Sequence, residues 1–423
     1  PLHLDVVPSG EGWHYPAFGG MIENDVLYGR GAQDNKGPII QMLYALYMVK
    51  RLGLPFKRTV RLIIASQEET GEWDDVDFYL QKEPAPNFSI VADSTFPIIN
   101  GEKGFADVKI ELTWKNKPGP LSMLQFSSLK AGERSNIVPN RADIAWEATA
   151  GQSAGISQTL KQCLQDYLQK YPDADAFPLR LDIDPESQTR SLCATFLGKS
   201  AHGSRPEDGR NAALDALKFL DTVPELPVQL VRVAHFLRDS CEDFYGTNLD
   251  IAGSHPFIGK TTVNLGILEI TKETASAVLN IRNTLGMTLH EMIGKIKTRV
   301  QTWADKNGME ASVKFVGKAH EPLYLNPKQH PELIASLQNA YRSVIGEEAQ
   351  LRAESGTTYA KAFPNALCFG PVLQSEEQSL AHQADECVKI SHVLRNTTIY
   401  ALMLLQLATD IEHTTTETIP DIL

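Results

Sequence analysis

The sequence predicts an α/β protein in which a mainly parallel sheet domain is split by an inserted α+β domain. Two near-continuous apolar runs of strand length, residues 60–65 and 89–92, are separated by a helical segment, which is typical of parallel strands buried on both faces. From Asp107 onward, half-buried strand patterns replace these runs. After about Lys318 the alternation of helices and buried strands returns. We therefore expect the split domain to comprise residues 1–104 and 319–423, and the inserted domain residues 105–318.

The first part of the chain begins with a short strand, residues 2–7, followed by a loop rich in Gly and Asp, residues 29–37. A helix is expected to start at Pro38, because proline is favoured at the first helical position. Its apolar positions recur at helical spacing: Ile39, Met42, Leu43, Leu46 and Val49. Gly53 ends this helix, as glycine commonly does. These elements predict a strand–helix–strand arrangement that leads into the run at residues 60–65.

In the inserted domain, the order strand, strand, helix, strand occurs twice. The first set is expected at residues 108–114, 137–146, 159–171 and 191–198, and the second at 262–270, 277–282, 289–305 and 312–316. A further helix follows Gly209. The two halves are not alike in sequence, so the repeat is one of architecture only. The last part of the chain predicts a helix at 331–345, a strand at 366–369 and a helix at 390–409.

Composition excludes several classes of protein. The 423 residues carry a net charge of −12 without a block of Lys or Arg, which excludes nucleic acid as a partner. Five scattered cysteines without a C-x-x-C pair indicate free thiols in the reducing cytoplasm. The longest apolar stretch, residues 399–405, is too short to cross a bilayer. Because the chain opens at Pro1, within a strand pattern and without an initiator Met, we expect an N-terminal portion of the natural protein to be absent.

Polar side chains gather where the predicted strands end. His3 and Asp5 close the first strand, Glu68 and Glu69 follow the second, and Asp93 follows the third. Because the carboxyl ends of parallel strands meet at one edge of a sheet, these side chains are expected to share a crevice, together with Asp34 from the loop before the first helix. Carboxylates crowded in this way repel one another unless cations neutralise them. The combination of His, Asp and Glu suits zinc.

The spacing of His3 and Asp5 gives a separate, geometric reason to place both residues in the metal site. Residues i and i+2 of a strand share a face, so Asp5 lies beside His3. A metal-bound histidine usually donates its other ring N–H to a carboxylate, so we expect His3 to be a ligand and Asp5 to orient it. Taken singly, each residue also fits an ordinary role: a surface histidine, a solvated glutamate pair, or a turn and helix cap at Asp34-Asn35. Their shared position at strand ends favours the metal site.

Several motifs in the chain resemble one family of enzymes. The sequence is similar to the co-catalytic di-zinc metallopeptidases of the aminoacylase, carboxypeptidase G and carnosinase family, most of all to PepV-like bacterial dipeptidases. The motifs that carry the resemblance run in order along the chain: His3-Leu-Asp-Val-Val-Pro, Gly29-Arg-Gly-Ala-Gln-Asp-Asn-Lys-Gly-Pro38, Gln67-Glu-Glu, Ala92-Asp-Ser-Thr-Phe-Pro97, Ser135-Asn-Ile-Val-Pro139, Ser200-Ala-His-Gly203, Asn280-Ile-Arg282 and His382-Gln-Ala-Asp-Glu386.

The resemblance implies a zinc-exopeptidase-like domain with an inserted lid domain, and it implies two divalent metal ions. His3 and Asp93 would hold one ion, Glu69 and His382 the other, and Asp34 would bridge them. Zinc is the expected metal, with cobalt or manganese as alternatives. In such enzymes the peptide bond between Asp34 and the next residue is typically cis.

The resemblance also assigns catalytic and substrate-binding residues. Glu68 would be the general base, and His202 would stabilise the oxyanion after the lid closes. Asn136 and Arg282 would bind the substrate, together with Gly356 in the loop Glu354-Ser-Gly-Thr-Thr-Tyr359, where two glycines of related enzymes are replaced by larger residues.

We therefore expect a cytoplasmic, metal-dependent dipeptidase that acts on small peptides. Two alternatives remain open at this point. One is another hydrolase of the same fold, an N-acyl amino-acid deacylase or a carboxypeptidase-like enzyme. The other is a metal-binding homologue without turnover. Because the doubled insert could supply His202 within one chain, we expect a monomer without a membrane association.

Overall fold

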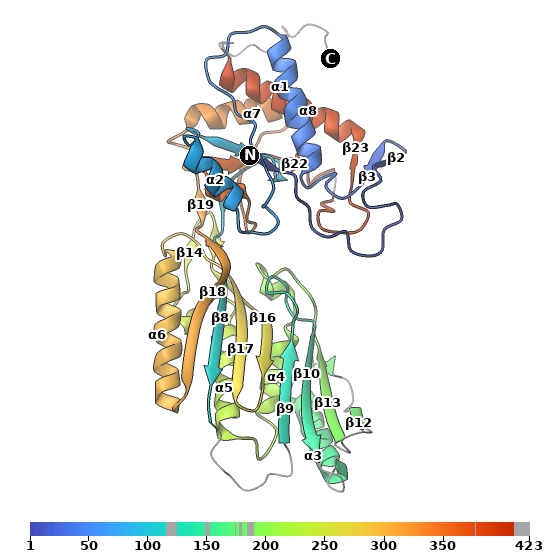
Figure 1. Cartoon of the computed structure of the whole chain (residues 1–423), viewed down its shortest axis with the longest axis vertical. Helices are drawn as coiled ribbons and strands as arrows, with labels where there is room; N and C mark the ends of the chain where they lie inside the picture. The colour runs from blue at the N-terminus through green and yellow to red at the C-terminus, as the bar shows by residue number, and fades with distance from the viewer. Residues whose placement is uncertain are drawn as a thin grey trace. The chain divides into compact units, whose positions relative to one another are not determined.

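The computed structural model describes residues 1–115, 125–148, 153–173, 175–176, 180–183, 190–376 and 378–409. The chain divides into two compact units. Unit 1 consists of Pro1–Glu102 and Pro322–Leu423, and unit 2 consists of Lys103–Glu321. The expected α/β fold class is confirmed. Each unit has its own sheets, helices and core (Figure 1).

Unit 1 is built around a mixed five-stranded sheet. Its strands are β19 (Leu323–Tyr324), β7 (Ile98–Glu102), β21 (Ala366–Cys368) and β5 (Ser89–Val91) in that order, with β20 (Leu351–Glu354) also paired to β7. The pairs β20–β7 and β21–β5 are parallel, whereas β21–β7 and β19–β7 are antiparallel. Two short parallel pairs accompany this sheet: β1 (Leu2–His3) with β4 (Ile64–Ala65), and β6 (Ser94–Thr95) with β22 (Pro371–Val372).

A small antiparallel sheet completes the strands of unit 1. It contains β2 (Met21–Glu23), β3 (Val26–Tyr28) and β23 (Cys387–Lys389). The strand β23 lies directly after the segment that carries His382. Its pairing with β3 brings that segment close to the loop that follows β3.

Three long helices of unit 1 pack together: α1 (Lys36–Arg51), α7 (Pro331–Ile345) and α8 (Ile390–Ala408) (Figure 1). They bury a core that includes Val49, Ile98, Leu337, Phe369 and Tyr400. The helix α1 begins two residues before the expected start at Pro38, which is tolerated because N–H groups of the first turn have no intrahelical partner. The shorter α2 (Asp74–Lys82) and η3 (Tyr359–Ala362) lie against a second cluster around Trp73.

The first two strands are shorter than the sequence predicts. Residues 2–7 and 60–65 were expected to be strands, but only two residues of each pair, in β1 and β4. Beyond Leu4 the chain leaves the ladder, because the carbonyl and carboxylate of Asp5 bind the His3 ring and the backbone of another segment. Leu4 and Ile64 are exposed, so burial on both faces was wrong for this pair.

Unit 2 contains one nine-stranded sheet in which every described pairing is antiparallel. Its order is β11 (Asp175–Ala176), β13 (Arg190–Leu197), β10 (Arg141–Ala148), β9 (Gln125–Ala131), β16 (Thr262–Ile270), β17 (Thr274–Arg282), β8 (Phe105–Thr113) and β18 (Glu310–His320), with β12 (Arg180–Ile183) also on β13. Burial alternates along β8, which shows that one face of the sheet is covered.

Helices α3 (Ser153–Lys170), α4 (Ala212–Leu220), α5 (Val228–Cys241) and α6 (Leu289–Asn307) contribute to the core of unit 2. Figure 1 shows α6 lying along β18. The order strand, strand, helix, strand occurs as β9-β10-α3-β13, apart from the short β11 and β12, and as β16-β17-α6-β18. The first set therefore begins at β9 and not, as expected, at residues 108–114, which lie in β8. The sequence did not predict β9 or α5. Smaller elements are η1 (Pro206–Asp208), η2 (Thr247–Leu249), β14 (Ser254–His255) and β15 (Gly259–Lys260).

All five cysteines are free thiols. Among the described residues, no helix has both the length and the apolar character needed to span a membrane.

Candidate metal centre

His3 is the buried centre of the site. Its position in β1 places the ring inside unit 1, where the residue is 0% exposed. Nδ1 lies 2.9 Å from the carbonyl oxygen of Asp5 and 3.3 Å from the Asp5 carboxylate. Nε2 points the other way, 2.9 Å from Oδ1 of Asp34 and 3.4 Å from Oδ1 of Asp93. The ring is therefore oriented through one nitrogen, and its other nitrogen faces two carboxylates.

Asp34 and Asp93 are held together by Asn35. The Asn35 amide donates to the carbonyl of Ala92 at 2.7 Å and to Oδ1 of Asp93 at 2.9 Å. Asn35 is the N-cap residue of α1, as the ordinary interpretation allowed, but its side chain makes no capping hydrogen bond. The peptide bond between Asp34 and Asn35 is cis, as the resemblance implied.

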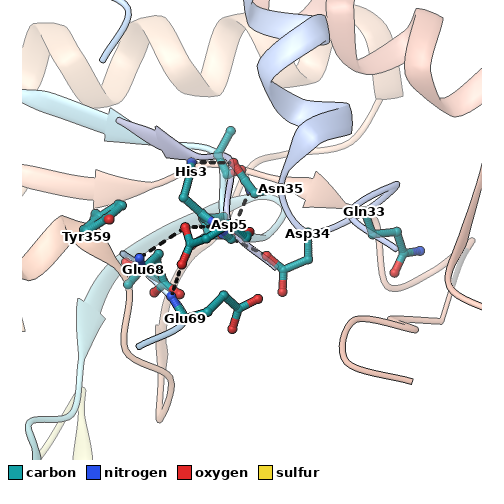
Figure 2. Close-up of polar contacts among 12 residues, drawn as sticks. His3, Asp5, Gln33, Asp34, Asn35, Glu68, Glu69 and Tyr359 are labelled. Carbon is teal, nitrogen blue, oxygen red and sulfur yellow. Dashed lines mark hydrogen bonds and ion pairs between the residues drawn. The ribbon is translucent and has the colours of Figure 1, made fainter. Parts of the chain in front are cut away.

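Glu68 and Glu69 lie in a turn after β4 whose backbone is fixed by Asp5. The Asp5 carboxylate accepts hydrogen bonds from Glu68 N at 3.3 Å and from Glu69 N at 3.0 Å (Figure 2). On the other side of the turn, the Tyr359 hydroxyl accepts from Gln67 N at 3.0 Å. Two segments far apart in sequence therefore hold the backbone of the turn that carries both glutamates.

His382 completes the cluster from the C-terminal part of unit 1. Its Nε2 lies 3.1 Å from Oδ2 of Asp34 and 3.1 Å from Oε2 of Glu69. The backbone of His382 has a φ of 65°, in the left-handed region. The side chain is 55% exposed, whereas His3 is buried, so the cluster opens to solvent on the His382 side. Asp34 thus lies between the two imidazoles.

The electrostatics of the cluster reflect its crowded carboxylates. Burial, the Asp93 charge and other neighbouring carboxylates raise the pKa of Glu68 well above its usual range. Burial and the Asp34 charge raise the pKa of Asp93 to about 7. Burial alone would lower the pKa of His3, but hydrogen bonds to Asp34 and Asp93 outweigh this effect and raise the pKa to about 12. Hydrogen bonds to Asp34 and Glu69 raise the pKa of His382 to about 10. Protons thus supply the positive charge that these carboxylates require.

The donor set fits divalent cations in place of these protons. In the set His3, Asp34 and Glu69, and in the set His3, Glu68 and Asp93, the ligand atoms all lie within 4.8 Å of one another. Imidazole and carboxylate groups are the donors that zinc takes in catalytic sites. The two sets share His3, and His382 contacts Asp34 and Glu69, so the residues of this cluster fit divalent metal.

The other expected site residues lie in several places. Asn136, His202 and Arg282 belong to unit 2. The Asn136 carbonyl accepts from Gly203 N at 2.7 Å, so Asn136 and the His202 segment are tied together. Both side chains are exposed. Gly356 belongs to unit 1, where its carbonyl accepts from Lys361 Nζ at 3.2 Å.

Arg282 is only 5% exposed, so it is not a solvent-facing strand residue. Its guanidinium carbon lies 4.6 Å from the centre of the Phe105 ring, and Nε donates to Oδ1 of Asn280 at 3.2 Å. Asn280 in turn donates to Asp107 at 2.7 Å. The guanidinium is therefore held in one direction by the sheet of unit 2.

Sequence reasoning missed three residues that build the site: Asn35, Tyr359 and Glu386. Asn35 follows Asp34 directly, and Glu386 follows His382 by four residues, so both belonged to motifs already recognised. Tyr359 carries no local signal, because its contact with Gln67 links two segments far apart in sequence.

Comparisons with known proteins identify the family of the chain. The family model described as "Peptidase family M20/M25/M40" matches residues 2–406. A protein of Bacillus subtilis (strain 168) named "Putative dipeptidase YtjP" is 31% identical over 408 residues, covering 96% of this chain and 82% of that protein.

Two solved structures share the fold. One is the M20 family metallo-carboxypeptidase Sso-CP2 from Sulfolobus solfataricus, with a TM-score of 0.53 and 16% identity over 95% of this chain and 83% of that one. The other is the aminoacylhistidine dipeptidase from Vibrio alginolyticus, with a TM-score of 0.51 and 13% identity over the same shares, 95% and 83%.

Fold and sequence together define a peptidase, a hydrolase of peptide bonds. The chain belongs to peptidase family M20/M25/M40, which confirms the resemblance found in the sequence.

Proposed function

We propose that this chain is a metal-dependent dipeptidase that cleaves small peptides. The observation that carries the proposal is the meeting of two imidazoles and four carboxylates at one edge of unit 1: His3, Asp34, Glu68, Glu69, Asp93 and His382. The name of the B. subtilis relative supports the substrate class.

Two divalent cations would occupy this cluster. Zinc is the expected metal because imidazole and carboxylate groups are donors that it binds in catalytic sites. His3 and Asp93 would hold one ion, Glu69 and His382 the other, and Asp34 would bridge them. When bound, such ions supply Lewis acidity that polarises a carbonyl and lowers the pKa of water toward neutrality. Their charge also offsets the carboxylate repulsion that raises the pKa of Glu68 and Asp93.

Glu68 is the proposed general base. Its carboxylate takes a proton from the attacking water and passes it to the nitrogen of the leaving amine. The Asp5 carboxylate accepts hydrogen bonds from the backbone N–H groups of Glu68 and Glu69, which lie in one turn. We assign different roles to the two side chains. Because Glu68 also lies within ligand distance of His3 and Asp93, the division of roles between the two glutamates requires a direct test.

Four further residues are assigned to substrate recognition. We assign the oxyanion contact to His202, whose Nδ1 lies 2.7 Å from the Ser204 hydroxyl. Arg282 and Asn136 are assigned to the C-terminal carboxylate, since a guanidinium binds a carboxylate through two parallel hydrogen bonds. Gly356 is assigned to the substrate-facing loop held by Lys361.

A matched substrate panel tests the proposal. A dipeptidase that recognises the free C-terminal carboxylate should cleave Ala-Ala far better than its amide or Ala-Ala-Ala. Elemental analysis should find about two metal ions per active chain, and a chelator should abolish activity that zinc, cobalt or manganese restores. An active enzyme without metal contradicts the proposal.

Two further results have a defined meaning. The panel also includes N-acetyl-alanine as a fourth substrate, and if it is cleaved best, the enzyme is a deacylase of the same fold. If the tripeptide matches the dipeptide in kcat/KM, the carboxylate assignment is wrong. Arg282→Ala should raise KM and lower kcat, whereas Arg232→Ala, an exposed arginine on α5, should change neither.

A further inference from the structure

Glu386 is a fully buried carboxylate outside the proposed ligand set. It is 0% exposed, and its Oε1 accepts three backbone hydrogen bonds: from Gly31 N at 3.0 Å, Gln33 N at 2.9 Å and Asp34 N at 3.1 Å. Gly31 adopts a φ of +89°, which favours glycine and lets the loop curl around this oxygen. One carboxylate oxygen therefore fixes the backbone of the loop that carries Asp34.

The second oxygen of Glu386 binds Arg30, which is itself buried at 3% exposure. Arg30 Nη1 donates to Oε2 of Glu386 at 2.8 Å and to the carbonyl of Gln383 at 3.0 Å. Arg30 Nη2 donates to the carbonyl of Ser9 at 3.0 Å, and the guanidinium lies over the Trp13 ring at 5.1 Å. A buried carboxylate with this many partners is anchored from every side.

Glu386 lies close in sequence to His382, a proposed metal ligand. Glu386 follows His382 by four residues, so one short segment carries both side chains. The loop that Glu386 holds carries Asp34, which His382 contacts at 3.1 Å. Glu386 therefore fixes the distance between two ligands that lie on segments far apart in sequence.

We infer that Glu386 is a positioning residue that sets Asp34 and His382 for the metal ions. The inference rests on the proposed metal centre. Glutamine at this position keeps the shape but not the charge. With its carbonyl oxygen toward the loop, its NH₂ group faces Arg30, and in the flipped orientation its NH₂ group faces three N–H donors. Either orientation leaves one contact repulsive, which loosens the loop.

Glu386→Gln should weaken zinc binding about 10–100-fold, the usual cost of losing a partner that orients metal ligands. Equilibrium dialysis against buffered zinc measures the dissociation constant, and the visible spectrum of the cobalt-loaded protein reports ligand geometry. Saturating zinc should largely restore kcat. A purely structural role would lower the melting temperature of the metal-free protein and leave both metal readouts unchanged, and that result would overturn the inference.

Asp385→Asn is the matched control. Asp385 lies beside Glu386 but binds His14 rather than the Asp34 loop, and asparagine tolerates its φ of 58°. Its zinc affinity should equal that of the wild type. If Glu386→Gln does not fold, Arg30→Lys is the second test variant. It keeps the positive charge beside Glu386 but loses the contacts of Arg30 with Gln383 and Ser9. An unchanged zinc affinity of Arg30→Lys also overturns the inference. A wild-type chain that binds no zinc instead contradicts the proposed function.

Discussion

The Nδ1 atom of His3 lies 2.9 Å from the carbonyl oxygen of Asp5, closer than the 3.3 Å to the Asp5 carboxylate. The backbone of Asp5 is thus the nearer acceptor for the His3 ring. The Asp5 side chain has a second task, since it accepts the N–H groups of Glu68 and Glu69. One residue therefore orients a proposed ligand on β1 and the turn that carries the proposed base.

Asp5→Asn should separate these two tasks. Its backbone carbonyl can still accept from His3, but the asparagine amide can accept from one of the two turn N–H groups while its NH₂ opposes the other. We expect zinc affinity and kcat each to fall about 10–100-fold. Metal titration and steady-state kinetics measure these changes. Glu11→Gln, an exposed change in the following loop, is the control, and equal behaviour of the two variants would contradict the role of Asp5.

Glu68→Gln and Glu69→Gln should fail in different ways. Glu68→Gln is expected to keep both metal ions and lose at least about 10²-fold in kcat, because general-base contributions run about 10²–10⁴. Glu69→Gln is expected to lose or weaken one ion. Elemental analysis beside kinetics distinguishes them. If both variants lose metal alike, Glu68 is a ligand and the assigned roles are wrong.

Metal uptake should release protons. In the metal-free protein, hydrogen bonds to Asp34 and Glu69 raise the pKa of His382 to about 10, so its imidazole is protonated at pH 8. A ligating histidine must be neutral, so zinc binding expels this proton, and zinc affinity should still rise as the pH approaches 10. Calorimetry in two buffers of different ionisation enthalpy counts the protons. His382→Ala should release about one proton fewer; an unchanged count contradicts this prediction.

The same shift predicts how metal-free stability varies with pH. A folded-state pKa above the ordinary value of 6.5 stabilises the fold below that pH, and the contribution is lost as pH rises through about 10. Thermal unfolding of the chelated protein should therefore show a falling melting temperature across this interval. His382→Ala should flatten the decline.

The protein should act as a monomer that uses its own His202. Unit 2 contains both strand-strand-helix-strand sets within one chain, and the strands of both sets belong to one sheet. Light scattering should give the mass of one chain. Mixing His202→Ala with Glu68→Gln chains should restore no activity, since each chain lacks one required group. A dimer mass together with restored activity would show that the partner supplies His202.

The sequence determined the α/β class and the residues at strand ends, because apolar periodicity and polar residues after strands are local properties of the chain. It predicted α7 to its observed ends, Pro331 and Ile345, where a favoured first proline and a following glycine mark both termini. It also assembled the candidate cluster from His3 to His382, since each member belonged to a recognisable motif.

The tertiary structure decided how those residues are held. The contact between Glu386 and Gly31 joins positions 355 residues apart, and the contact between Tyr359 and Gln67 joins positions 292 residues apart. It also ended β1 at His3, where Asp5 leaves the ladder for other partners. Such hydrogen bonds depend on which segments the folded chain brings together. Local periodicity carries no record of them, because it reports only which face of an element is buried.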